Sequence, residues 1–64
     1  MKDTYYVWRG VVGEILSMRM STPKRIDALK NAADSAIMNP GFIYIVCKNE
    51  SDNEIAKFFV RKED

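Results

Sequence analysis

The chain has 64 residues, 47% of them hydrophobic, and its ten basic and nine acidic side chains leave a net charge of +1. This length allows one domain, residues 1–64, and excludes a second. The near-balance of charge excludes a histone-like basic protein and an acidic mimic of DNA.

The supply of reactive side chains is small. The sequence contains no histidine and a single cysteine, Cys47. These counts exclude His-based acid–base catalysis, Ser-His and Cys-His nucleophiles, an internal disulfide and a structural zinc site. We expect a protein that is not an enzyme, has no catalytic residues and holds neither a metal nor a cofactor.

The expected compartment is the cytoplasm. A lone cysteine suits a reducing environment. The polar start of the chain, Met1-Lys2-Asp3-Thr4, is not typical of a secretory signal. No stretch approaches the roughly 20 apolar residues that span a membrane, so no membrane association is expected.

The first third of the chain is predicted to form a β-hairpin. Residues 4–9 are rich in strand formers, residues 15–20 alternate, and Gly13-Glu14 can turn the chain between them. Gly10 is a candidate bulge. The alternation places Met18 and Met20 on the same side. It leaves open whether three aromatic residues are core or interface: Tyr5, Tyr6 and Trp8.

The middle third predicts one amphipathic helix over residues 23–38. Thr22 can cap it, Pro23 suits the first helical position, and Asn39-Pro40-Gly41 ends it. Apolar residues recur at steps of three and four, and they form the stripe expected to face the core: Ile26, Leu29, Ala33, Ala36 and Ile37.

The last third predicts a second hairpin. Residues 42–47 and 55–61 are strand-forming, residues 49–53 form a polar turn, and the charged end, residues 61–64, is expected to fray. The predicted fold class is therefore α+β. It is an antiparallel sheet of about four strands, in the order β-β-α-β-β, with one amphipathic helix packed on one face.

A single helix leaves the other face of such a sheet open. In the last strand, alternation gives a core side of Ala56, Phe58 and Val60 and an outward side of Ile55, Lys57, Phe59 and Arg61. In the strand before it, the residues that face outward are either Phe42, Tyr44 and Val46 or Ile43, Ile45 and Cys47. From these strands we predict four binding residues: Tyr44, Lys57, Phe59 and Arg61.

A second candidate binding feature is basic. Lys24 and Arg25 stand in the first turn of the predicted helix, where cations oppose the helix dipole, and Arg19 lies just upstream. These three cations are a candidate cluster for an acidic partner, and the alternative is ordinary solvated charge.

Cys47 and the acidic residues have plainer interpretations. Cys47 follows an apolar run and precedes Lys48, and we favour a small buried hydrophobe over an activated thiolate. Three acids alternate near the last turn, but the segment lacks the framework of a calcium loop: Glu50, Asp52 and Glu54.

Two classes of ligand fit an outward face that mixes aromatic and basic groups. Protein interfaces are enriched in Tyr, Trp, Phe, Met and Arg, whereas single-stranded nucleic acids stack their bases on aromatic rings and place phosphates on cations. The near-neutral charge favours a protein partner, and nucleic acid is the runner-up. A structural subunit of a homo-oligomer is the third alternative, so a homodimer stays open.

The order of elements resembles a known type of protein. The run from Thr22 to Ala33, followed by Gly41 to Ile45, is similar in layout to small phage-encoded inhibitors of host RNA polymerase and to certain small anti-CRISPR proteins. The resemblance covers most of the chain as an order of elements, and the acidic strip of the polymerase inhibitors is not evident. It implies a host-takeover protein that binds one host protein or complex engaged in nucleic-acid handling or defence.

Overall fold

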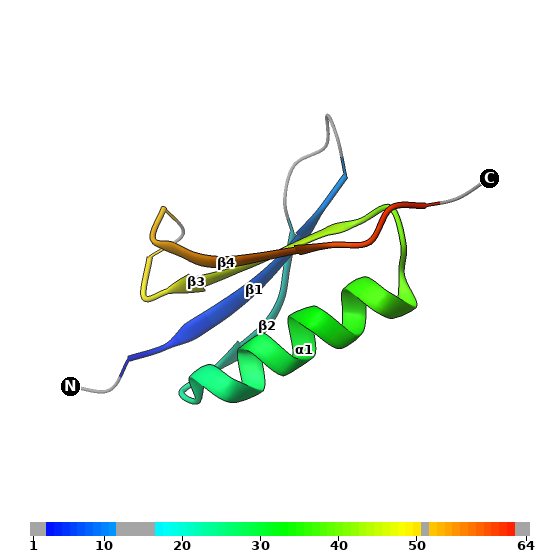
Figure 1. Ribbon diagram of the computed structural model, residues 1–64. Helices are drawn as coiled ribbons and strands as arrows, with labels where there is room; N and C mark the ends of the chain where they lie inside the picture. The colour runs from blue at the N-terminus through cyan, green and yellow to red at the C-terminus, as the bar shows by residue number, and fades with distance from the viewer. Residues whose placement is uncertain (1–2, 12–16, 51, 63–64) are drawn as a thin grey trace.

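The computed structural model describes residues 3–11, 17–50 and 52–62, and it confirms the predicted α+β class. Four strands and one helix follow one another along the chain (Figure 1): β1 Tyr5–Gly10, β2 Ser17–Thr22, α1 Arg25–Met38, β3 Ile43–Lys48 and β4 Glu54–Phe59.

The strands form one antiparallel sheet in the order β2-β1-β3-β4. β1 and β3 are the central strands, and their sequences, YYVWRG and IYIVCK, are rich in the aromatic and β-branched residues that suit a sheet interior. α1 connects β2 to β3 and lies along one face of the sheet (Figure 1). The opposite face is therefore not covered by the helix.

Alanines, and not the larger apolar residues, form the buried side of α1. Ala28, Ala32 and Ala36 recur at every fourth position and are all buried. They share one core cluster with side chains from the sheet: Tyr5, Val7, Tyr44 and Val46. Because the sheet supplies large side chains, the helix fills the remaining space with small ones and lies close to the strands.

The predicted apolar stripe of the helix is wrong in part. Ala36 is buried and Leu29 packs against the core, as predicted. Ile26 and Ile37, however, are 73% and 66% exposed. The sequence carries two apolar stripes at helical spacing, and the narrower alanine stripe is the one that fits against the sheet.

The ends of α1 differ slightly from the prediction. The helix begins at Arg25, and Lys24 is its N-cap without a capping side chain. Thr22 lies two residues before this N-cap, and its hydroxyl oxygen accepts a hydrogen bond of 3.2 Å from the backbone N–H of Lys24. At the other end Gly41 has φ of +96° and donates its N–H to the carbonyl of Val60 at 2.9 Å.

A bulge in the β1–β2 pair corrects two expectations. Val7 pairs with Met20 and Trp8 with Met18, so the two methionines lie on opposite faces of the sheet, with Arg19 as the extra residue. Gly10 pairs regularly with Ile43, so the bulge is not at Gly10. The predicted turn at Gly13-Glu14 lies outside the described residues.

The turn after β3 holds the N-terminal segment. Asn49 has φ of 64°. Its backbone N–H donates to the carbonyl oxygen of Thr4 at 2.7 Å, and its side-chain Oδ1 accepts a hydrogen bond from the backbone N–H of Thr4 at 2.9 Å. The side-chain amide of Asn49 also donates a hydrogen bond to the carboxylate of Asp3. This carboxylate lies 3.4 Å from the Lys48 ammonium. The hydrogen bonds from Asn49 and then Lys48 lower the pKa of Asp3.

No helix within the described ranges combines the length and the apolar content needed to cross a membrane.

Candidate binding face

The side of the sheet opposite α1 is built from three rows of residues paired across the strands. The alternation of β1 defines it, because Val7 is in the core and its neighbours Tyr6 and Trp8 point to the other side. The rows are Met18–Trp8–Ile45–Lys57, Gly10–Ile43–Phe59 and Ser21–Tyr6–Cys47–Glu54. We call these three rows the open face.

Most of the open face is apolar, and its two ends are exposed to solvent. Phe59 on β4 is 53% exposed, and Met18 on β2 is 52% exposed. Between them lie partly buried side chains of the central strands: Tyr6, Trp8, Ile43 and Ile45. An apolar surface therefore runs from one edge of the sheet to the other.

The charge on this face is small and internally paired. Lys57 is the one cation of the three rows, and its ammonium lies 3.4 Å from the carboxylate of Glu54, three residues earlier on the same strand. Arg9 belongs to the other side, because it pairs with Tyr44 and its guanidinium stacks 4.8 Å from the ring centroid of Phe42.

Trp8 is an inner member of the row Met18–Trp8–Ile45–Lys57. It pairs with Met18 on one side and Ile45 on the other. Its indole Nε1 is buried and has no hydrogen-bond partner among the described residues. A buried donor without a partner costs about 1–3 kcal/mol, and such groups are rare enough in folded proteins to mark a position of interest.

The structure separates the predicted binding residues. Phe59 and Lys57 lie on the open face, so the predicted outward direction of Phe59 is confirmed. Tyr44 is not on this face: it is 3% exposed and lies in the core cluster, paired with Phe58. The prediction for Tyr44 is corrected, since β3 turns Ile43, Ile45 and Cys47 to the open face and Tyr44 and Val46 to the helix.

The predicted basic cluster lies at a different place from Lys57 and Phe59. Arg19, Lys24 and Arg25 are all exposed, on β2 and at the start of α1. β2 and β4 are the two edges of the sheet, three strand spacings or about 14 Å apart. The seven predicted residues therefore do not make one site.

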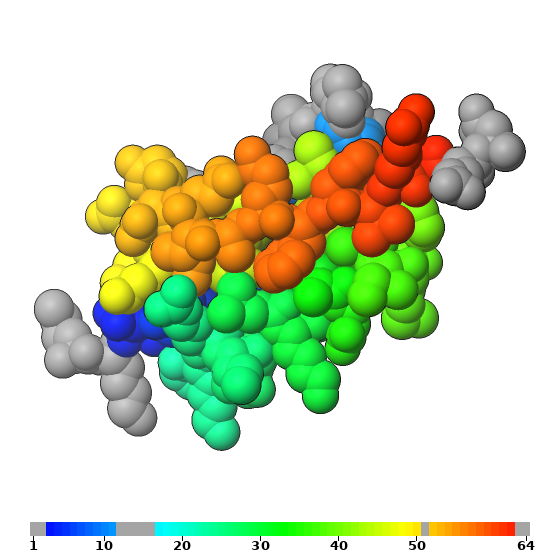
Figure 2. Space-filling model, in the orientation of Figure 1, coloured from blue at the N-terminus to red at the C-terminus, as the bar shows by residue number. Residues whose placement is uncertain are grey.

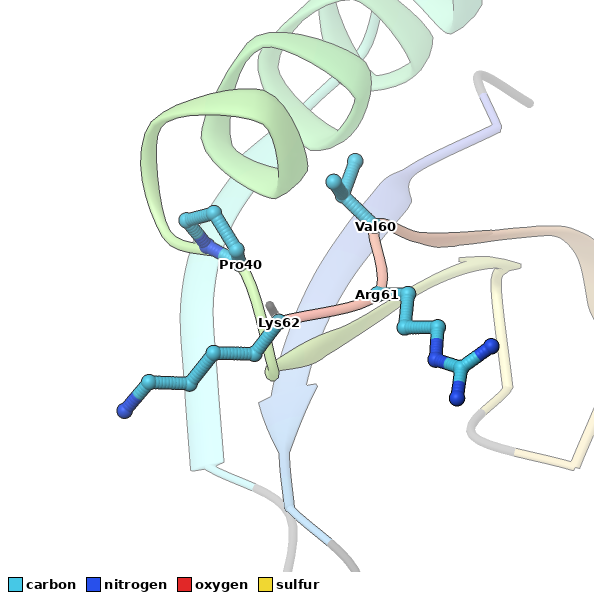
Figure 3. Close-up of a pocket in the computed structure, with 4 residues that line it drawn as sticks. All are labelled: Pro40, Val60, Arg61 and Lys62. Carbon is cyan, nitrogen blue, oxygen red and sulfur yellow. The ribbon is translucent and has the colours of Figure 1, made fainter. Parts of the chain in front are cut away.

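Arg61 borders a shallow hollow beyond the end of β4. The hollow is lined by Pro40, Val60, Arg61 and Lys62. Figure 3 shows that the side chains of Arg61 and Lys62 extend in opposite directions, while Val60 points toward the helix. The two cations do not converge on a common point, so the hollow is not built to hold an anion.

Cys47 has the environment of a packed hydrophobe. Its side chain is 1% exposed, and burial raises the pKa of the thiol, with a further contribution from the negative charges of Glu54 and Asp52. A raised pKa keeps the thiol protonated, which is unfavourable for nucleophilic attack. Among the described residues no three acidic or thiol side chains come together as a metal site.

The sequence-based prediction missed the middle of the open face. Five residues of this face were not among the predicted binding residues: Tyr6, Trp8, Met18, Ile43 and Ile45. Alternation alone could have grouped Tyr6 with Trp8 on one side of the strand. Tyr5 lies on the other side, in the core. The position of Met18 on this face was not predictable from alternation, because the bulge places Met18 and Met20 on opposite faces.

The fold and this face define a class: a small α+β domain whose four-stranded sheet is covered by a helix on one side and presents an apolar face on the other. No protein-family model, no curated protein and no solved structure matches the chain. The similarity in layout to small phage inhibitors stays a prediction.

Proposed function

We propose that this chain is a non-enzymatic module that binds another protein through its open face. The observation that supports the proposal is the continuous apolar surface from Met18 to Phe59, whose two end residues are about half exposed. Trp, Tyr, Phe and Met are enriched at the centres of protein interfaces, because large side chains release the most water on contact.

The electrostatics favour a protein over a nucleic acid as the partner. Binding of single strands requires cations along the groove that follows the backbone. The three rows carry one cation, Lys57, and Glu54 neutralises it. Arg19, Lys24 and Arg25 lie at the far edge and the helix start. A partner with an apolar surface and few charges fits the open face better than a phosphate backbone does.

The layout extends this proposal to a more specific one. In this proposal the chain acts in the cytoplasm as a phage-encoded inhibitor or modulator. It binds one host complex that acts on nucleic acid or in host defence. Stoichiometric binding is sufficient for that role, so it requires no catalytic group, metal or cofactor.

The test is capture from a bacterial lysate with quantitative mass spectrometry, comparing the parent with Phe59→Ala. Truncating Phe59 should reduce the recovery of the specific partner about fivefold or more, as is typical of a hot-spot residue. The melting temperature should stay within a few degrees, since Phe59 is 53% exposed. Met38→Ala is the matched control, because Met38 is 79% exposed and lies on the helix.

Two results would contradict the proposal. Equal recovery with the parent and with Phe59→Ala would show that the partner does not use the open face. Tight binding of a labelled single-stranded oligonucleotide that disappears at moderate salt would make nucleic acid the ligand, because phosphate contacts release counterions.

A further inference from the structure

The outer side of α1 carries a second apolar surface, separate from the open face. Ile26 and Ile37 are the most exposed isoleucines of the described ranges, at 73% and 66%. They are eleven residues apart, which corresponds to a rotation difference of about 20° and an axial distance of about 16 Å on an α-helix. Both therefore project from the same side, with Ala33, partly buried, between them.

This stripe points away from the sheet. The buried side of α1 is centred on Ala32, which lies about 120° around the helix from Ile26. Figure 2 shows side chains of α1, in green, projecting on the side away from β4. Two isoleucines in water forgo burial that the alanines of the same helix obtain, so the stripe is a candidate contact surface.

We infer that a second copy of this chain occupies the stripe, with the two α1 helices packed antiparallel about a twofold axis. The stripe is self-complementary in this arrangement. Ile26 and Ile37 are equally distant from the midpoint of the helix segment between Asn31 and Ala32, so Ile26 of each copy meets Ile37 of the other. The small Ala33 lies near the axis, where helices must approach closely.

The charges beside the stripe fit the same arrangement. Lys30 and Asp34 are exposed on one flank of it, and neither forms an ion pair with a described residue. In an antiparallel twofold pair, the same flank of both helices meets. Lys30 of one copy then lies about one residue along the axis, or about 1.5 Å, from Asp34 of the other. Two symmetric ion pairs form.

The contact is short. The 14 residues of α1 give a helix of about 21 Å, and such a contact covers less area than the roughly 800 Å² per partner of a stable interface. We therefore place the dissociation constant in the micromolar range or above. If the open face binds a protein as proposed, the dimer carries two such faces, one on each outer side, and binds a clustered target with avidity.

The experiment is sedimentation equilibrium of the chain alone, from about 5 to 500 μM, so that it does not depend on the proposed partner. The parent should dimerise. Ile37→Glu should weaken dimerisation at least about tenfold, and Phe59→Glu, the matched change on the open face, should leave it unaltered. Circular dichroism of each variant checks the fold, which substitution of these exposed positions should preserve.

Charge reversal tests the register. Lys30→Asp and Asp34→Lys alone should each weaken the dimer, and the two together should restore it to within about threefold of the parent. A monomer throughout the range, a dimer broken by Phe59→Glu but not by Ile37→Glu, or a double variant that stays as weak as the single ones would overturn the inference.

Discussion

Enlarging the small residue at the centre of the helix–sheet contact should strongly destabilise the protein. Ala32 is fully buried, in one cluster with Val7 and Val46, which are also fully buried. Ala32→Leu adds three carbons at a position that has no exposed surface. Overpacking of this kind costs about 1–3 kcal/mol, and we expect the upper half of that range.

The matching change on the exposed stripe should be nearly neutral. Ile26 is 73% exposed, so only about a quarter of its side chain is covered. Full burial of an isoleucine stabilises by about 1.5–3 kcal/mol, and a quarter of that is about 0.4–0.8 kcal/mol. Alanine recovers up to about 0.7 kcal/mol in helix propensity. Ile26→Ala should therefore change the free energy of unfolding by less than about 0.5 kcal/mol.

Thermal unfolding at about 5 μM protein separates the two variants. The entropy of unfolding for 64 residues is about 0.13 kcal/mol/K. Ala32→Leu should then lower the melting temperature by about 15–22 °C, and Ile26→Ala should change it by less than about 4 °C. If Ile26→Ala cost over 2 kcal/mol and Ala32→Leu were tolerated, the isoleucine stripe would face the sheet and the reasoning about α1 would be refuted.

Three further outcomes are expected. Leu29→Ala should lower the free energy of unfolding by about 2 kcal/mol in urea titrations. This is the low end for leucine truncation, because Leu29 is only partly buried. A loss below about 0.5 kcal/mol would show that Leu29 does not pack on the core. Gly41→Ala should cost about 1–2 kcal/mol in the same titration, because Gly41 has φ of +96°, a conformation that side chains with a Cβ rarely adopt. An unchanged midpoint would contradict the left-handed turn. Burial raises the pKa of the Cys47 thiol in the folded chain, so the unfolded chain loses this proton at a lower pH than the folded chain does. The free energy of unfolding should therefore keep its full value below about pH 9, the ordinary thiol value, and decrease above it. Cys47→Ala should flatten that decline between pH 8 and 10.5, and an equal decline in both proteins would exclude the thiol as its cause.

Local patterns were sufficient for the elements and for part of the open face. The apolar run of residues 42–47 predicted β3, Asn39-Pro40-Gly41 predicted the end of α1, and the alternation around Phe59 predicted its outward direction. In each case neighbours along the chain carry the signal, because a strand repeats every two residues and Pro or Gly interrupts a helix without help from distant contacts.

The choice of faces was decided by tertiary structure. β3 is apolar on both sides, so its own sequence does not say whether Tyr44 or Ile45 points to the helix, and pairing with β1 settles the matter through Val7 and Val46. The bulge opposite Val7 and Trp8 then sends Met18 and Met20 to different faces. Register between strands is a non-local property, and a shift of one residue reverses every side chain.

α1 shows the same division. The alanine stripe and the isoleucine stripe both have helical spacing, and hydrophobicity alone favours the isoleucines. The sheet offers Tyr5 and Tyr44 as large core residues, and the space they leave accepts alanine and excludes isoleucine. Which stripe is buried depends on the volume available between helix and sheet, and that volume exists only once the strands are assembled.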